Sequence, residues 1–264
     1  MLRVLWRVLS SLPAYLWSGW GAGASLLLLL ASWEAVAALY DPLILPDPLT
    51  AFAALWVQVQ QGAAGPALWA TARRAFMGLA LALGVGSVLG LLAGLSVTAS
   101  VLSRPLVTVL LGTPPIAWLV LAMLWFGTGD GTPVFTVFVA CLPVVFIGAL
   151  QGTRTLDLHL KDMARAYRLP WRMRLLDVYL PHVAAYLFPA WITALGSSWK
   201  VAVMAELLAT SDGVGAALAV TRSHLDMGAS LAWICAVVGI LLLLEYGVLE
   251  PIKRELERWR EAGA

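Results

Sequence analysis

Long runs of apolar residues, separated by short polar segments, follow one another along nearly the whole chain. A helix needs about 20 mostly apolar residues to cross the roughly 30 Å hydrocarbon core of a membrane. The apolar residues are continuous rather than alternating, which predicts spanning helices and argues against the strands of a membrane barrel. The runs that reach this length are 17–39, 76–98, 105–126, 133–151, 184–209 and 229–250.

The composition supports this pattern. Of 264 residues, 61% are hydrophobic and only 12% are charged, whereas soluble domains carry about 25% charged residues. A water-soluble enzyme is excluded, because so much apolar surface cannot be buried in one core of this size. A disordered chain is excluded as well, since it needs low hydrophobicity and high charge. The sequence therefore predicts an all-α, polytopic membrane protein.

The first apolar run has two interpretations. Arg3 and Arg7 precede it and Ala35-Val36-Ala37 resembles a cleavage site, as in a secretion signal. The run is longer than the apolar core of a signal, so we interpret it as a first span. After it, Leu49, Phe52, Ala53, Trp56 and Val59 recur at helical spacing, which predicts a short amphipathic helix along the outer interface. The four-residue spacing of Gly86, Gly90 and Gly94 in the second run predicts close helix packing.

Basic residues gather on one side of the predicted spans, and internal loops are enriched in Lys and Arg. If the N-terminus is inside, the external segments contain Arg73, Arg74 and Arg222. The internal segments then contain Arg3, Arg7, Arg104, Arg154, Lys161, Arg165, Arg168, Arg172, Arg174, Lys253, Arg254, Arg258 and Arg260. This bias predicts six spans with both termini in the cytoplasm.

The internal loop 152–182 is long and basic. Leu156, Leu160, Met163, Ala164 and Tyr167 share one helical face, and Pro170 ends that helix. The stretch 171–179 predicts a second helix that ends before Leu180-Pro181. Two short helices would form a compact projection on the cytoplasmic face. The alternative is a plain basic loop held to anionic lipid headgroups.

A motif in this loop resembles that of a known family. Asp162-Met163-Ala164, Arg168, Val178 and Leu180-Pro181 have the spacing of Glu-Ala-Ala, three residues, Gly, nine residues, Ile, one residue, Leu-Pro. That motif marks the permease subunits of binding-protein-dependent ATP-binding-cassette (ABC) importers. Two further stretches resemble the branch that imports nitrate, sulfonates and taurine. They are Pro114-Pro115 with Leu124-Trp125-Phe126-Gly127, and Trp199-Lys200 with Ala205-Glu206-Leu207 and Gly213-Val214-Gly215.

The resemblance, which covers residues 45–260, implies a type I ABC importer permease fold for residues 1–264. It implies six spans and a cytoplasmic coupling helix between the fourth and fifth spans, within 152–182. That helix would dock on an ABC ATPase dimer. Further implied partners are a second permease copy, as a homodimer, a periplasmic substrate-binding protein and the lipid of a bacterial inner membrane. Arg168 departs most from the motif, because the family's glycine permits a left-handed turn that costs other residues about 1 kcal/mol. Either Arg168 accepts that strain or Pro170 reshapes the turn.

No nucleotide site is expected in this chain. A phosphate-binding loop of the form Gly-x-x-x-x-Gly-Lys-Ser/Thr is absent, because Lys161, Lys200 and Lys253 all lack the preceding glycine. ATP and Mg²⁺ are therefore expected on a partner ATPase, and this chain is not expected to be an enzyme. Neither a metal site nor a nucleic-acid partner is expected. His159, His182 and His224 lie in or beside loops without partners at metal spacing and predict a solvated surface role.

Ionisable residues inside spans are costly and are therefore candidates for a translocation pathway. Lys200 and Glu206 lie six residues apart, about 240° around a helix, which disfavours a direct pair. Lys200 either faces an anionic solute, after a helix break at 196–198, or pairs with a carbonyl or Glu34. Glu206 is expected to hold the turn 211–213.

Other pathway candidates are Trp199, beside Lys200, and the pair Pro114 and Pro115, which removes backbone donors and bends the third span. That bend would either line a cavity or serve as a packing kink. Two other functional classes remain open. An integral-membrane enzyme would use Asp157, His159 and Asp162, the one loop cluster of acids and histidine. A secondary transporter would need inverted repeats, and no clear repeat is present.

Overall fold

The computed structural model describes residues 20–155, 166–168 and 170–250, which contain helices, turns and irregular segments but no strands. The all-helical prediction is confirmed for these residues. The chain divides into two compact units, each described here by itself. Unit 1 comprises Met1–Ala63 and Val220–Glu255, and unit 2 comprises Ala64–Ala219 and Leu256–Ala264. The expected single domain over 1–264 stays a prediction.

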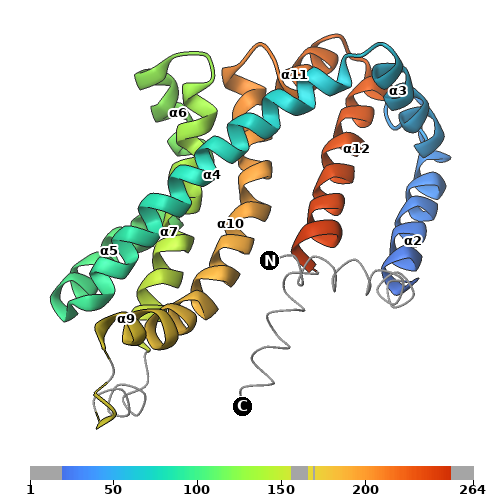
Figure 1. Cartoon of the computed structure of the whole chain (residues 1–264). Coiled ribbons are helices and arrows are strands. Elements are labelled where there is room, and N and C mark those ends of the chain that lie inside the picture. The colour runs from blue at the N-terminus through green and yellow to red at the C-terminus, as the bar shows by residue number, and fades with distance from the viewer. Residues whose placement is uncertain (1–19, 156–165, 169, 251–264) are drawn as a thin grey trace. The chain divides into compact units, whose positions relative to one another are not determined.

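Three long helices form the centre of unit 2 (Figure 1). They are α4 (Ala64–Leu95), α7 (Gly131–Arg154) and α10 (Leu180–Ala209). Each packs against the other two. The predicted spans 133–151 and 184–209 correspond closely to α7 and α10. However, α4 begins at Ala64 rather than at residue 76, so Arg73 and Arg74 lie inside this helix. Their location outside the membrane stays a prediction.

The glycines of α4 allow its backbone to lie directly against α7. A Cβ atom added at Gly90 would clash with Phe146 O and lie 2.6 Å from the Cβ of Ala149. At Gly94 it would lie 2.5 Å from the Cβ of Thr153. Helices without such small residues cannot approach this closely. The predicted close packing is therefore confirmed.

The third predicted span, 105–126, is not one helix. Here α5 (Val97–Gly112) and α6 (Pro115–Phe126) meet at a bend of 91°. Ser96 begins α5 as its N-cap, accepting a hydrogen bond from the Ala99 N–H. Pro114 and Pro115 have no N–H to continue the backbone ladder, so the first helix ends and a second begins at Pro115. The bend predicted at Pro114-Pro115 is confirmed. The prediction of one continuous helix over 105–126 is wrong.

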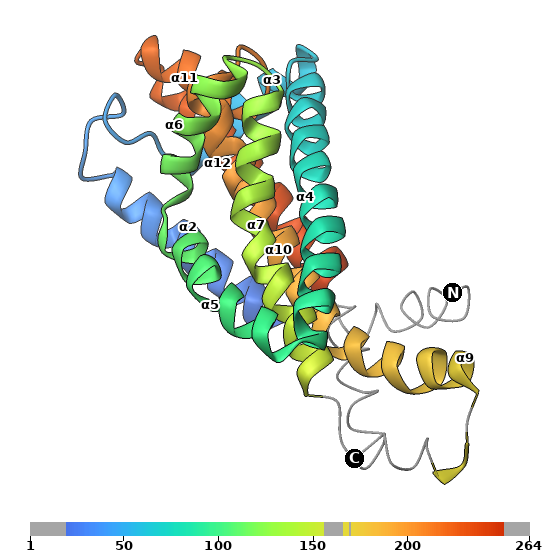
Figure 2. The same ribbon diagram turned by 90° about the vertical axis from the view of Figure 1, so that its left-hand side faces the viewer.

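The helical path into α10 starts earlier than expected. A short helix, α9 (Trp171–Met173), is followed without a gap by the π-helix η1 (Arg174–Tyr179) and then by α10. The predicted end before Leu180-Pro181 is wrong, because Pro181 lies in the first turn of α10, where no N–H partner is needed. The expected helix break at 196–198 is also wrong, since α10 continues to Ala209. Figure 2 shows α9 at the end of unit 2 opposite to α6 and α11 (Val214–Ser223).

Unit 1 contains α2 (Trp20–Ala37), α3 (Pro48–Gln60), α12 (Met227–Leu244) and the π-helix η2 (Glu245–Leu249). The predicted amphipathic helix is confirmed as α3. It packs on α12 and buries Ala51. Leu49, Phe52 and Trp56 on its predicted apolar face are exposed. The location of α3 along the outer membrane interface stays a prediction.

Within the described residues, the helices α4, α7, α10 and Met227–Gly247 are long and apolar enough to cross a membrane. The bent pair α5 and α6 adds a fifth candidate span if it is counted as one. Gly23–Ala37 is apolar but shorter. The six-span count therefore stays a prediction.

The contact between α4 and α7 leads to a first prediction. Gly90→Ala should lower the free energy of unfolding by about 1–3 kcal/mol, because the added methyl group has no room. Gly84→Ala is the matched control, since a Cβ there meets nothing within 4 Å. Thermal unfolding of both variants in detergent, followed by tryptophan fluorescence, tests this. Equal unfolding temperatures for the two variants would contradict it.

Candidate functional site

Lys200 lies exposed on α10, on the same helical face as Thr193 and Ser197. The intervals of four and three residues place these three side chains in one row. The hydroxyl groups of Thr193 and Ser197 donate to the carbonyls of Pro189 and Thr193 and keep acceptor capacity. Within the described part of unit 2, the Lys200 ammonium has neither a hydrogen-bond nor an ion-pair partner. Glu34 belongs to unit 1, so its pairing with Lys200 stays a prediction.

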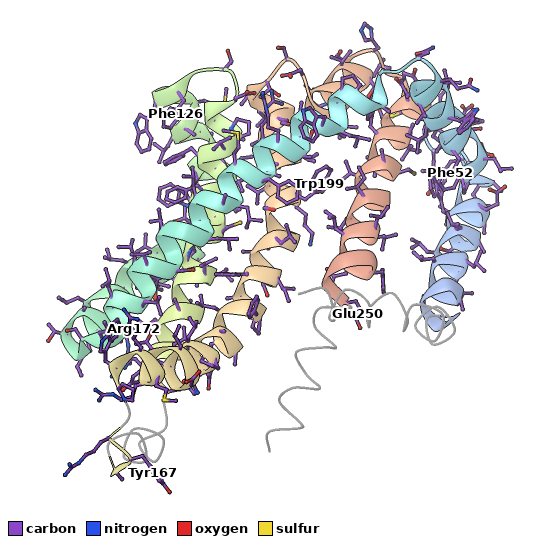
Figure 3. All side chains as sticks on the ribbon, in the orientation of Figure 1. Phe52, Phe126, Tyr167, Arg172, Trp199 and Glu250 are labelled. Atoms are coloured by element: carbon purple, nitrogen blue, oxygen red, sulfur yellow. The ribbon has the colours of Figure 1, made fainter. Side chains whose placement is uncertain are left out.

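The other pathway candidates have different surroundings. Trp199 is buried, with 3% of its surface exposed, and lies midway along unit 2 in Figure 3. Pro114 is exposed and Pro115 is half-buried, at the bend between α5 and α6. Neither proline contacts Lys200 or Glu206 through a hydrogen bond. The structure thus does not gather these candidates into one site.

Glu206 is fully buried near the end of α10. One carboxylate oxygen accepts from Arg74 Nη1 at 2.8 Å. The other accepts from Thr71 Oγ1 at 2.6 Å and from the Gly215 N–H at 3.2 Å. The expectation that Glu206 holds the turn after α10 agrees with these contacts, and its principal partner is a residue that sequence reasoning missed.

Arg74 is the centre of this cluster and is 2% exposed. Its Nε donates to Asp130 Oδ1 at 2.7 Å. Its Nη1 donates to Glu206 and to the Asp212 carbonyl oxygen, each at 2.8 Å. Its Nη2 pairs with Asp212 Oδ1 at 2.5 Å and with Asp130 Oδ1 at 2.6 Å. Four of the five N–H donors of the guanidinium group are thus hydrogen-bonded, and Asp130 forms an additional ion pair with Nη2.

The turn between α10 and α11 wraps around the Glu206 side chain. Gly213 has a φ of 99°, which only glycine adopts without strain. A Cβ atom on Gly213 would lie 2.5 Å from Glu206 Oε2. The Val214 N–H donates to Thr71 Oγ1 at 2.9 Å. The glycines of the Gly-Val-Gly stretch thus serve the close approach of this turn to a buried carboxylate.

The exposed rim of the cluster consists of Arg73, Asp130 and Asp212. Arg73 pairs with Asp130, and both side chains are about half exposed. Partial burial by itself would raise the pKa of the Asp130 carboxyl. The hydrogen bonds and positive charges of Arg74 and Arg73 outweigh it, so the pKa lies below its usual value. The Gly129 N–H donates to the Ala209 carbonyl at 2.9 Å, which ties the loop before α7 to the end of α10.

The loop motif lies at the opposite end of unit 2. Asp162, Met163 and Ala164 fall outside the described residues, as do Asp157 and His159. Arg168 has a φ of 49°, so it adopts the left-handed conformation for which the motif uses glycine. Val178 lies in η1, and Leu180 and Pro181 are exposed at the start of α10. Tyr167 and Arg172 project at this end in Figure 3, and Arg172 lies 5.5 Å from the ring centroid of exposed Trp171.

The base of this loop is held by contacts between α7 and α10. Thr155, which ends α7, lies 3.3 Å from His182 Nε2, and the His182 ring lies 5.3 Å from that of Tyr186. His182 is half-buried, and its predicted surface role stays a prediction. A Cβ on Gly152 would come within 3.1 Å of the Val183 backbone. Among the described residues no group of His, Cys, Asp and Glu could hold a metal ion.

Comparison with known proteins identifies the family. The profile of the family "Binding-protein-dependent transport system inner membrane component" matches residues 86–249. The chain belongs to this family. The match includes the loop motif, Lys200 and Glu206, whereas Arg74 lies before it.

Three relatives place this permease more closely. A Bacillus subtilis protein, named as an aliphatic sulfonates transport permease, is 28% identical over 92% of this chain and 89% of its own. The taurine transport system permease protein of Escherichia coli is 29% identical over 89% of this chain and 88% of its own. A nitrate import permease protein of Leptolyngbya laminosa is 30% identical over 55% and 52%. The permease belongs to the nitrate, sulfonate and taurine branch of ABC importers, whose members are transport components rather than enzymes.

The charge cluster of the permease predicts a pH dependence. Because the folded pKa of Asp130 is depressed, its contribution to stability is full above the unfolded value near 3.9 and is lost as pH falls through the lower folded value. The unfolding temperatures of wild type and Asp130→Asn should therefore differ at pH 6 and converge below about pH 4. Asp47→Asn, at an N-cap without a side-chain hydrogen bond, is the control. A wild-type advantage over Asp130→Asn that stays constant to pH 3 would contradict this assignment.

Proposed function

We propose that this permease is the transmembrane subunit of an ATP-driven importer in a bacterial inner membrane. It takes a small polar, anionic solute from a periplasmic binding protein. Two copies form the pathway, and a separate ABC ATPase dimer, with its ATP and Mg²⁺, binds the loops 152–182. Both termini lie in the cytoplasm. The relatives named for sulfonates, taurine and nitrate support a solute that carries an oxyanion.

One observation carries the proposal: a helical path without a gap runs from Trp171 in the loop, through η1, to Ala209 at the far end of unit 2. It passes Lys200 and ends beside Glu206. A displacement of the loop is therefore transmitted along this one helical path to Lys200. The tight contact of Gly148 and Gly152 with α10 adds α7 to the same moving body.

The ATPase-binding surface is proposed to include the exposed side chains at the loop end of α10. Tyr167 is 75% exposed and Trp171 is 64% exposed, while Arg172 lies over the Trp171 ring. Exposed aromatic residues beside arginine are typical of binding hot spots. Arg168 lies between Tyr167 and Trp171 in the chain, and its strained, left-handed φ turns the backbone between these two aromatic residues.

Purification of the intact complex from membranes tests this assignment. A nucleotide-binding subunit should copurify with the tagged permease, and Trp171→Ala should reduce its recovery by about tenfold, the loss of roughly 1.4 kcal/mol. Trp69→Ala is the matched control, because Trp69 is 72% exposed but lies on α4. The importer assignment fails if no such subunit copurifies. The proposed ATPase-binding surface is contradicted if Trp171→Ala and Trp69→Ala retain the nucleotide-binding subunit equally.

Lys200 is proposed to attract the solute anion along the pathway. The Lys200 ammonium is exposed and has no partner among the described residues of unit 2. Beside it, the hydroxyl groups of Thr193 and Ser197 offer hydrogen-bonding groups that can rearrange. Lys200→Met should lower uptake of nitrate or taurine by proteoliposomes about tenfold. Lys200→Arg keeps the charge and should retain most uptake. Uptake by Lys200→Met equal to that of wild type, in complexes with intact ATP hydrolysis, discards this role.

A further inference from the structure

The Arg74 cluster joins the ends of four chain segments in unit 2. They are α4 with Thr71 and Arg74, the loop 127–130, the end of α10 with Glu206, and the turn 210–215. All of them lie at the end opposite to α9 (Figures 1 and 2). We propose that Arg74 is a positioning residue of the transport cycle. It holds the turn after α10 to α4 and to the loop before α7, so that these four ends move as one body.

The proposal rests on the importer function. The ATPase would act at the loop end of α10, and the solute would enter at the Arg74 end. The helix α10 is unbroken, but it transmits a displacement to neighbouring segments only if its far end is bonded to them. Glu206 and Asp212, on either side of the end of α10, are bound by the same guanidinium group. The Arg74 cluster therefore attaches the far end of α10 to α4 and to the loop before α7.

The turn depends on this cluster for its hydrogen bonds. The N–H groups of Val214 and Gly215 donate to the side chains of Thr71 and Glu206. The Asp212 carbonyl accepts from Arg74 Nη1 and from Thr210 Oγ1. Removal of Arg74 would leave Glu206 buried without its charge partner and would release the turn.

The chemistry favours positioning over simple stabilisation. A buried ion pair gains little stability compared with apolar residues of similar volume, because both charges must leave water. An arginine with four hydrogen bonds in fixed directions, however, determines the geometry of the groups it binds. Lysine offers a single charged point with three donors, so it would retain the charge and lose the geometry.

Hydrogen exchange of the complex tests the local claim. In Arg74→Lys and in Asp212→Ala, amides of 211–215 should exchange at least about tenfold faster than in wild type. The exchange rates of amides 148–152, near the C-terminal end of α7, should equal those of wild type. Arg73→Gln is the matched control, since the neighbouring arginine is half exposed and pairs with Asp130. Asp212 is 63% exposed, so its replacement leaves a folded protein. Unchanged exchange at 211–215 in both variants overturns the proposal.

A second experiment separates positioning from stability. The double variant Arg74→Met with Glu206→Met removes the buried pair and should restore thermal stability relative to Arg74→Met alone. We expect both this variant and Asp212→Ala to keep basal ATP hydrolysis while taurine uptake per ATP falls severalfold. Wild-type uptake per ATP in both overturns the proposal. If the wild-type complex itself shows no ATP-driven uptake, the importer function fails, whereas the exchange result stands independently.

Discussion

A polar group inside a membrane has no water to bind, so it must find its partner within the protein. Much of unit 2 follows from this constraint. Hydroxyl groups on its long helices donate to carbonyls of the preceding turn, as Thr136 and Ser197 do. Pro114 and Pro115 cannot continue the backbone hydrogen bonds of a helix. The chain therefore bends sharply there, and a new helix begins at Pro115. Arg74, the largest fully buried side chain among the described residues, forms four hydrogen bonds to protein partners.

The same constraint makes Lys200 informative. It is exposed on α10, and the described residues of unit 2 provide it with no counter-ion. This exposed cation is the physical ground for the proposal that Lys200 attracts an anionic solute. Glu206, only six residues later on α10, has the opposite environment and a fixed set of protein partners. Two ionisable residues of the same predicted span thus have different surroundings.

Close packing determines how far a displacement can travel. Glycines at 90 and 94 bring α4 against α7, and those at 148 and 152 bring α7 against α10. Backbones in direct contact cannot slide without a clash, so the three helices form a stiff frame. The loop motif lies at one end of this frame and the Arg74 cluster at the other. Coupling between the two ends then needs no separate moving part in unit 2.

Local patterns in the sequence were sufficient to predict the membrane environment, the helical class, the approximate positions of α7, α10 and α12, and the family. These depend on continuous apolar runs and on a spaced motif, both of which are local properties. The positions of Arg74 and the true start of α4 were not accessible in this way. The apolar run begins at residue 76, and charges before it look external unless their partners are known.

Only the tertiary structure supplied those partners, because Asp130, Glu206 and Asp212 lie 56, 132 and 138 residues away from Arg74 in the chain. With these partners, Arg74 is among the most buried of the described residues of the unit.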